Sequence, residues 1–270
     1  AVHLIETHGD SPFYLNLAHY AVHTPLGAKP ELEKKYEALA DSSYFQHNAT
    51  YAAMIQSVDE SLAKLLAALE RKGILDNTLI IVTSDNGAVH RISGSYPLRK
   101  GKGSEYEGGV RVPLITYWKG HILPNQRNST PVITMDLFST VLDVACVELK
   151  DEKVDGISLL PVIKGEDLKV RPLFWHYPHY HNGGARPYSS VRLDEWKLIK
   201  QYETHTYELY NLKEDIGEKE DLSKKNPDKV NELRGILEKW LKNVDAQLPF
   251  ANANWNSEKE RKTGKYAGVD

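Results

Sequence analysis

The sequence predicts an α/β fold, a sheet flanked by helices, followed by a small antiparallel sheet that carries one helix. Two observations lead to this fold class. Strand-like and helix-like segments alternate through the first half of the 270 residues, as they do in α/β sheets. After about residue 155, short strand-like runs follow one another with turns between them, which is typical of an antiparallel sheet. A chain of this length can bury a sizeable core.

The first strand and the first long helix are predicted from apolar patterning. Residues 12–17 form a short apolar run that reads as a buried strand, and residues 18–25 read as the loop at its end. Residues 46–72 place apolar side chains on one face at helical spacing. Gly73 suits the end of that helix, because glycine adopts the left-handed conformation that often follows a helix.

Two more strands and a helix complete the main sheet. Residues 79–82 are apolar and β-branched, as in a central parallel strand. Residues 112–118 read as another strand, and residues 134–147 as a helix. We expect Cys146 on the apolar face of this helix, as a buried and unreactive thiol.

The last third of the chain has a different pattern of predicted secondary structure. Short strands are predicted at residues 174–177, 188–192, 196–201 and 207–212. An amphipathic helix over residues 226–247 opens with Asn226 as N-cap and Pro227 at its first position. We therefore expect an α/β domain over residues 1–165, a small α+β subdomain over residues 166–256, and a polar tail over residues 257–270.

The composition excludes several classes of function. The net charge is −3, and no long basic block is present, so nucleic acid is not an expected partner. No stretch approaches the ~18 apolar residues of a membrane span, so an integral membrane protein is not expected. The single cysteine excludes an internal disulfide framework.

Asp85 and Asn86 directly follow a predicted strand, in the block Ser84-Asp85-Asn86-Gly87. Because sites in α/β sheets lie at the carboxyl ends of strands, this position suits a functional site. The two side chains offer oxygen ligands for Ca²⁺ or Mg²⁺. The ordinary alternative is an Asx turn that ends the strand. Ca²⁺ takes ~6–8 oxygen ligands, so others must come from elsewhere.

Lys102 lies between two glycines in the block Lys100-Gly101-Lys102-Gly103. Glycines let the backbone approach a ligand closely, and a lysine there can hold an anionic oxygen as a compact charge. The alternative is a solvated loop lysine, for which Lys100 is the natural comparison. The loop does not have the Walker A pattern of phosphate-binding loops.

Histidines supply the remaining candidates. His23 follows the first predicted strand, where it can bind a leaving-group oxygen or donate a proton; a packed or surface histidine is the alternative. His176, His179 and His181 do not have the spacing of a zinc site, so they read as a substrate-facing loop or as surface histidines. His176 and His90, which lies in a loop near Asp85, are further candidates for substrate binding.

Several blocks together resemble the sulfatase family of the alkaline-phosphatase-like superfamily, over nearly the whole chain. The most specific is Pro97-Leu-Arg-Lys-Gly-Lys102-Gly-Ser-Glu-Tyr-Glu107-Gly-Gly-Val-Arg111-Val-Pro113. Supporting blocks are Pro12-Phe-Tyr-Leu, Ala21-Val-His23-Thr-Pro25, Ser84-Asp85-Asn86-Gly87, Asp155-Gly-Ile-Ser-Leu-Leu-Pro161, Trp196-Lys-Leu-Ile and Glu208-Leu-Tyr-Asn-Leu.

This resemblance implies an alkaline-phosphatase-like sheet and hydrolysis of sulfate esters with a bound divalent cation, usually Ca²⁺. By the family pattern, Asp85 and Asn86 match metal ligands, Lys102 matches the sulfate-contacting lysine, and His23 matches the histidine near the leaving oxygen. The substrates implied are a sulfated carbohydrate or an aryl sulfate. The resemblance also implies export, to the periplasm, the cell exterior or a lysosome.

The family nucleophile is a formylglycine made from the cysteine or serine of a Cys/Ser-x-Pro/Ala-x-Arg motif. We expect this motif to be absent from the chain, together with the paired aspartates that accompany it in the family, and Cys146, followed by Val-Glu-Leu, does not fit the motif. We therefore expect the formylglycine in an N-terminal segment missing from this chain, and we expect the 270 residues alone to be inactive. A related phosphodiesterase or phosphonate hydrolase, or a non-catalytic remnant that binds sulfated glycans, are the alternatives.

Overall fold

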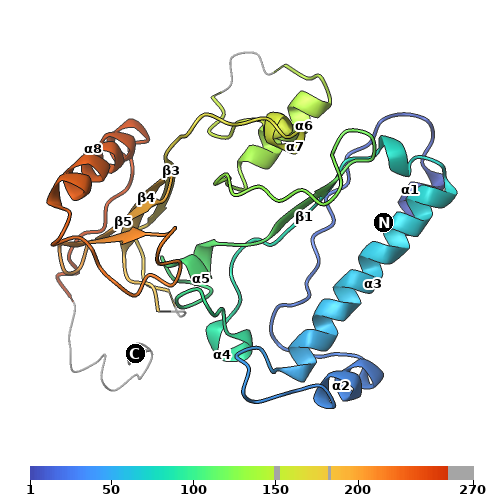
Figure 1. The fold of residues 1–270 in the computed structure, drawn as a ribbon, viewed down its shortest axis with the longest axis horizontal. Coiled ribbons are helices and arrows are strands. Elements are labelled where there is room, and N and C mark those ends of the chain that lie inside the picture. Colours follow the sequence, from blue (N-terminus) through green and yellow to red (C-terminus); the bar gives the residue numbers. More distant parts are fainter. Residues whose placement is uncertain (149–152, 182–183, 255–270) are drawn as a thin grey trace. The chain divides into compact units, whose positions relative to one another are not determined.

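The computed structural model describes residues 1–148, 153–181 and 184–254. They form two compact units: residues 1–83, 91–94 and 114–126 make the first, and residues 84–90, 95–113 and those from 127 onward make the second. Figure 1 traces the elements of both units along the chain. The predicted polar tail, residues 257–270, lies outside the described residues. Within the described part, no helix is both long and apolar enough to cross a bilayer.

The first unit is built around the long helix α3 (Ala49–Arg71), labelled in Figure 1. The side chain of Asn48 caps this helix by accepting a hydrogen bond of 2.9 Å from the backbone N–H of Tyr51. The helix predicted over residues 46–72 is therefore confirmed. The other helical segments in this part of the chain are α1 (Val2–Thr7), α2 (Pro30–Glu37), η1 (Leu75–Asn77) and α4 (His90–Ser93).

Residues 12–17 do not form a strand, so that prediction was wrong. Phe13 and Leu15 nevertheless pack against the core formed by Ile5, Ala68 and Leu69. The apolar spacing therefore reports real burial against a helix. It does not report pairing in a sheet, because burial and strand pairing leave the same apolar pattern in a short segment.

The first unit contains a two-stranded sheet of β1 (Ile80–Thr83) and β2 (Leu114–Tyr117). Both predicted strands are confirmed, but they pair antiparallel, whereas a parallel central strand was expected for residues 79–82. An apolar run predicts a strand without fixing the direction of its neighbour, so this part of the prediction was wrong for the described pair. Alternate side chains of β2 remain exposed, Ile115 at 60% and Tyr117 at 41%.

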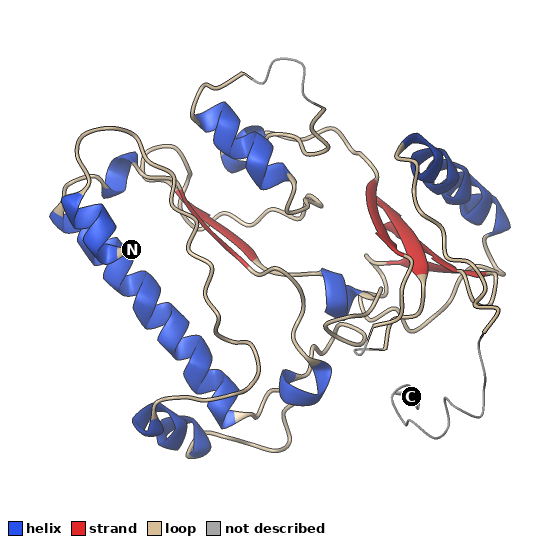
Figure 2. Ribbon diagram, turned by 180° about the vertical axis from the view of Figure 1, so that it is seen from behind, coloured by secondary structure: helices blue, strands red, loops and turns tan. Residues whose placement is uncertain are grey.

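The second unit contains an antiparallel sheet in the order β3-β4-β5-β6. Its strands are β3 (Leu173–Tyr177), β4 (Tyr188–Leu193), β5 (Trp196–Gln201) and β6 (Thr206–Asn211). Helix α8 (Pro227–Asn243) covers one face of this sheet, as Figure 2 shows. The buried side chains of this layer are Val191, Leu198, Leu209, Leu233, Leu237 and Leu241. The small sheet and its helix are therefore confirmed.

The other face of this sheet is covered by a second cluster. Leu198 packs with helix α8, whereas its neighbour Ile199 packs with Tyr106, Tyr188 and Tyr210. This is the alternation that a strand buried on both faces requires. Tyr106 comes from the segment that contains Lys102, so the sheet carries the candidate loop on this face.

Short helices complete the second unit: α5 (Glu107–Val110), α6 (Asp136–Val144) and α7 (Leu160–Ile163). Helix α6 confirms the helix predicted over residues 134–147, but it ends before Cys146. Cys146 is exposed and adopts a positive φ of 53°. The prediction of a buried thiol was therefore wrong, because the helical face on which it depended stops at Val144.

Candidate active site

Asp85 and Asn86 follow the end of strand β1, as the sequence predicts. Asp85 is exposed and Asn86 is half-buried. The hydroxyl of Ser84 donates a hydrogen bond of 3.0 Å to the backbone carbonyl of Asn86 and lies 3.5 Å from an Asp85 carboxylate oxygen. The Ser84 hydroxyl therefore contacts both candidate ligand residues, Asp85 through its side chain and Asn86 through its backbone.

Two backbone hydrogen bonds join this turn to the loop that carries Lys102, residues 99–109, which we call the lysine loop. The N–H of Gly87 donates to the carbonyl of Gly109 at 3.0 Å, and the N–H of Lys102 donates to the carbonyl of Ala88 at 2.8 Å. A Cβ atom on Gly87 would lie 1.8 Å from the carbonyl oxygen of Gly108. Glycine is therefore required for the two segments to meet. Asp85, Asn86 and Lys102 belong to one local structure.

Lys102 is half-buried, and a histidine lies against the residue that follows it. Gly103 has a φ of +78°, and a Cβ atom there would lie 1.9 Å from Nδ1 of His181. The backbone N–H of Ala185 also donates to the carbonyl of Gly103 at 2.9 Å. The structure therefore places the loop that contains His181 on the lysine loop.

The other histidines of the second unit occupy different surroundings. His176 is half-buried on strand β3, where Nε2 donates to the carbonyl of Gln247 at 2.9 Å and Nδ1 lies 2.7 Å from the hydroxyl of Ser189. His179 is exposed. His90 is exposed too, and its backbone N–H would lie 2.9 Å from a Cβ on Gly101. Of the predicted histidines in this unit, His90 and His181 lie beside the lysine loop, whereas both ring nitrogens of His176 have other contacts.

His23 belongs to the first unit, and its surroundings are those of that unit. It is exposed, and its Nδ1 donates to the carbonyl of Thr24 at 2.7 Å. Its ring lies 5.5 Å from the ring of Tyr20, between centroids. The Nδ1 bond orients the imidazole, so Nε2 is the nitrogen available for acid–base chemistry.

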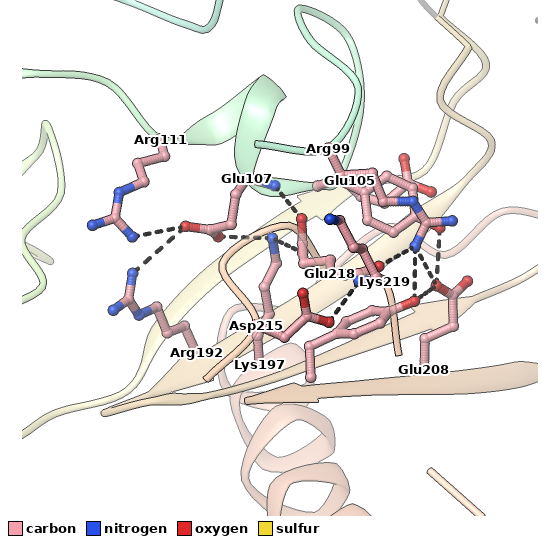
Figure 3. Close-up of polar contacts among 12 residues, drawn as sticks. Arg99, Glu105, Glu107, Arg111, Arg192, Lys197, Glu208, Asp215, Glu218 and Lys219 are labelled. Atoms are coloured by element: carbon pink, nitrogen blue, oxygen red, sulfur yellow. Dashed lines mark hydrogen bonds and ion pairs between the residues drawn. The ribbon is translucent and has the colours of Figure 1, made fainter. Parts of the chain in front are cut away.

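A buried polar layer lies beneath the lysine loop, and sequence reasoning missed it. Figure 3 shows its charged members, among them Arg99, Glu107, Lys197 and Glu218. Lys197 is fully buried, and its ammonium nitrogen lies 2.9 Å from a carboxylate oxygen of Glu107 and from one of Glu218. Charged residues are normally predicted on the surface, which is why these were overlooked.

Burial sets the protonation of the tyrosines in this layer. The hydroxyls of Tyr106 and Tyr210 donate to the same carboxylate oxygen of Glu208, at 2.9 Å and 2.6 Å. Burial, reinforced by the nearby carboxylate of Glu208, raises the pKa of both tyrosines far above the usual range. Both therefore act as neutral hydrogen-bond donors.

The donor set suits part of a calcium or magnesium site. Asp85 and Asn86 present hard oxygen ligands of the kind both ions prefer. Within residues 1–148, 153–181 and 184–254, however, no group of three or more histidine, cysteine, aspartate or glutamate side chains is arranged to hold a metal ion. Because Ca²⁺ takes ~6–8 oxygens, the two residues fit as one side of a larger site.

One pentapeptide corrects an expectation about the nucleophile. Ser95-Tyr-Pro-Leu-Arg99 has the spacing Ser-x-Pro-x-Arg, so a segment with the form of the modification motif is present in the chain. Its serine lies in a turn, where the carbonyl of Ser95 accepts from the N–H of Leu98 at 2.8 Å. The guanidinium of Arg99 donates hydrogen bonds to the hydroxyl of Tyr210 and to the backbone carbonyl of Glu218 in the buried layer, both at 2.9 Å.

Comparison with known proteins defines the class to which this fold and site belong. The sulfatase family model matches residues 1–147, and the model described as N-sulphoglucosamine sulphohydrolase, C-terminal, matches residues 101–247. The chain belongs to the sulfatase family. A curated relative, a sulfatase of Formosa agariphila, is 36% identical over 258 residues, which are 86% of this chain and 46% of the relative.

Solved structures agree with this assignment. Ps i-CgsB in complex with k-i-k-neocarrahexaose superposes with a TM-score of 0.80 at 32% identity, covering 97% of this chain and 56% of that one. BT4656 in complex with its substrate D-glucosamine-2-N,6-O-disulfate gives a TM-score of 0.61 at 29% identity, covering 74% and 41%. The predicted fold class is confirmed. The chain spans about half the length of these relatives.

Proposed function

We propose that the protein hydrolyses sulfate esters and that its substrate is a sulfated carbohydrate. The observation that supports this most is the backbone junction between Gly87 and Gly109, which brings Lys102 into one local structure with Asp85 and Asn86. Two structural relatives support the sugar: one binds neocarrahexaose, and the other has a disulfated glucosamine as substrate. An aryl sulfate is the alternative substrate.

Lys102 and His23 carry the proposed chemistry of this chain. Lys102 places a compact positive charge against the anionic oxygens of the sulfuryl group, where negative charge is concentrated in the transition state. His23 donates a proton from Nε2 to the departing alcohol oxygen, which would otherwise leave as an unstable alkoxide. His90 and His181 lie beside the lysine loop, where they can contact the sugar.

Asp85 and Asn86 are the proposed metal ligands of this chain, with further ligands supplied from outside the 270 residues. A bound Ca²⁺ or Mg²⁺ would supply positive charge that polarises the sulfuryl oxygens. A formylglycine, also from outside these residues, would supply the nucleophilic oxygen. Ser95 is not proposed as its precursor, because Arg99 of that pentapeptide is held in the buried layer.

The full-length protein tests the proposal directly. Sulfate release is measured from a sulfated oligosaccharide and an aryl sulfate, and turnover of a phosphodiester is measured in parallel. Lys102→Ala should lower kcat by about 10²–10³-fold, the usual cost of removing one group that stabilises developing charge. Lys100→Ala, two residues away on the same loop, is the matched control and should retain activity. Equal losses in the two variants would refute the role of Lys102.

The same experiment separates the alternatives. Preferred turnover of the phosphodiester would favour a phosphodiesterase or phosphonate hydrolase. Binding of the sulfated oligosaccharide without any hydrolysis would favour a glycan-binding remnant. Ser95→Ala should leave sulfate release unchanged, and its complete loss would identify Ser95 as the nucleophile precursor and overturn an external nucleophile.

A further inference from the structure

Lys197 is buried under the loop that carries Lys102. It lies on strand β5, and its side chain is 0% exposed. Strand alternation puts Lys197, Ile199 and Gln201 on the face of the sheet that meets residues 99–109. A lysine is almost never fully buried unless it is paired. Its partners are the carboxylates of Glu107 and Glu218, each 2.9 Å from its ammonium nitrogen.

Glu107 is the first residue of helix α5 and the end of the lysine loop. It is 2% exposed, and besides Lys197 it faces Arg111 at 3.4 Å and Arg192 at 3.8 Å. Figure 3 shows its carboxylate among these three cations. Burial alone would raise the pKa of Glu107, but the cations outweigh burial and hold that pKa below its ordinary value. Glu107 is therefore an anion in the folded protein.

Glu218 holds both ends of the lysine loop. Its Oε2 accepts a hydrogen bond of 2.6 Å from the backbone N–H of Glu107, and its backbone carbonyl accepts one of 2.9 Å from Arg99. Its Oε1 makes the ion pair with Lys197, in a geometry that is not that of a hydrogen bond. Residue 218 therefore contacts the loop at residues 99 and 107, on either side of Lys102.

Backbone hydrogen bonds connect the lysine loop to the rest of the candidate active site. The N–H of Gly108 donates to the carbonyl of Arg99 at 2.9 Å, which closes the loop on itself. The next residue, Gly109, accepts from the N–H of Gly87, the neighbour of Asn86. A continuous series of contacts thus runs from Lys197 through Glu107 to the lysine loop and to the turn that carries Asp85 and Asn86.

We propose that Lys197, paired with Glu107 and Glu218, is a positioning residue that holds the lysine loop and the Asp85–Gly87 turn in one geometry. The role of Lys102 in this inference rests on the proposed function. A buried ion pair is weak evidence for stability, because an apolar replacement of similar volume is often neutral or stabilising. The role proposed for these ion pairs is to fix one conformation of the lysine loop. Their loss should therefore change the lysine loop and the Asp85–Gly87 turn and leave the rest of the unit unchanged.

Amide hydrogen exchange in the full-length protein tests the hold itself. Lys197→Met should accelerate exchange of the Gly87 and Lys102 amides by about tenfold or more, because both donate hydrogen bonds within the held segment. Exchange at Leu237, inside helix α8, should change by less than about twofold. Lys200→Met, on the same strand, is the matched control and should leave all three amides unchanged. Unchanged exchange at Gly87 and Lys102, or equal acceleration at Leu237, would overturn the proposal.

A second variant guards against misfolding, since Lys197→Met removes the ion-pair partner of buried Glu218 and leaves Glu107 with Arg111 and Arg192 alone. The triple variant Lys197→Met, Glu107→Gln, Glu218→Gln keeps the volumes and removes all three charges. It should fold and should still show fast exchange at Gly87 and Lys102; protection there equal to the wild type would overturn the proposal.

Kinetics then separate positioning from stability. The triple variant should lose kcat by at least about tenfold with KM nearly unchanged, as when a group acts mainly in the transition state. A normal kcat would overturn the catalytic part of the inference. If the wild type itself releases no sulfate, the proposed function fails, whereas the exchange result still decides whether Lys197 holds the loop.

Discussion

Gly87 illustrates how single residues set the geometry of this site. A Cβ atom at this position would meet the carbonyl oxygen of Gly108 at 1.8 Å, which is a backbone atom that cannot swing aside. We expect Gly87→Ala to separate the ligand turn from the lysine loop. The free energy of unfolding should fall by about 1–3 kcal/mol, and sulfate release should be lost. Urea unfolding and a turnover assay of the full-length protein measure the two effects.

Gly235 provides the control for this substitution. It lies exposed in helix α8, and nothing lies within 4 Å of a Cβ added there. Gly235→Ala should stabilise the protein by about 0.5–1 kcal/mol, because alanine loses less backbone entropy in a helix. If Gly87→Ala behaved like Gly235→Ala, the close approach at the site would be disproved.

Glu107 predicts a pH dependence of stability. Its pKa in the folded protein lies below the ordinary 4.5, because Lys197, Arg192 and Arg111 outweigh the opposing effect of burial. Its contribution to stability is therefore present above pH 4.5 and is lost as the pH falls through the lowered pKa. The difference in Tm between wild type and Glu107→Gln should therefore shrink as the pH falls below 4.5 and through the lowered pKa. Glu238→Gln, at an exposed position of helix α8, controls for loss of one carboxylate, and a difference independent of pH would contradict the prediction.

Some site residues were predictable and others were missed, for a physical reason. Asp85, Asn86 and Lys102 stand out because acidic, amide and cationic groups follow a strand or lie between glycines. Lys197 does not stand out, since a charged residue in a strand usually faces solvent. The signal was its neighbours: Leu198 and Ile199 are apolar on opposite faces, so the strand is covered on both sides and Lys197 needs a partner.

At the scale of elements, helix α8 and its sheet bury an apolar layer between them. Leu237 is fully buried between this helix and strands β4, β5 and β6. Leu237→Ala should lower the free energy of unfolding by about 2–5 kcal/mol, through lost apolar burial and the cavity that remains. Urea unfolding measures this loss. Glu238→Ala, next in the chain and exposed, should change it little, and equal losses would refute the packing.

The elements also show what apolar patterning predicts. Long helices such as α3 and α8 carry several turns of the same apolar face, so their periodicity is unambiguous. Strands β1 and β2 are short apolar runs, and such a run contains no information about its partner or direction. The segment around Phe13 has the same character, which is why burial was predicted correctly and pairing was not.

At the scale of the whole molecule, the chain holds only part of the proposed chemistry. It supplies Lys102, His23 and two oxygen ligands, and it spans about half the length of its relatives. We expect the 270 residues, purified alone, to release no sulfate above the uncatalysed rate, because no activated nucleophile is proposed within them. The full-length protein, assayed with the same aryl sulfate, is the control. Release by the 270 residues at a comparable rate would place the nucleophile inside the chain.

The sheet of β1 and β2 has a practical consequence for anyone who produces this chain by itself. Within the described residues this sheet has two strands, β1 and β2, so both lie at its edges. Ile115 and Tyr117 expose apolar surface on the same strand. Unprotected, apolar edges recruit further strands and promote aggregation. Charged substitutions at these two positions are therefore the first changes to make for solubility.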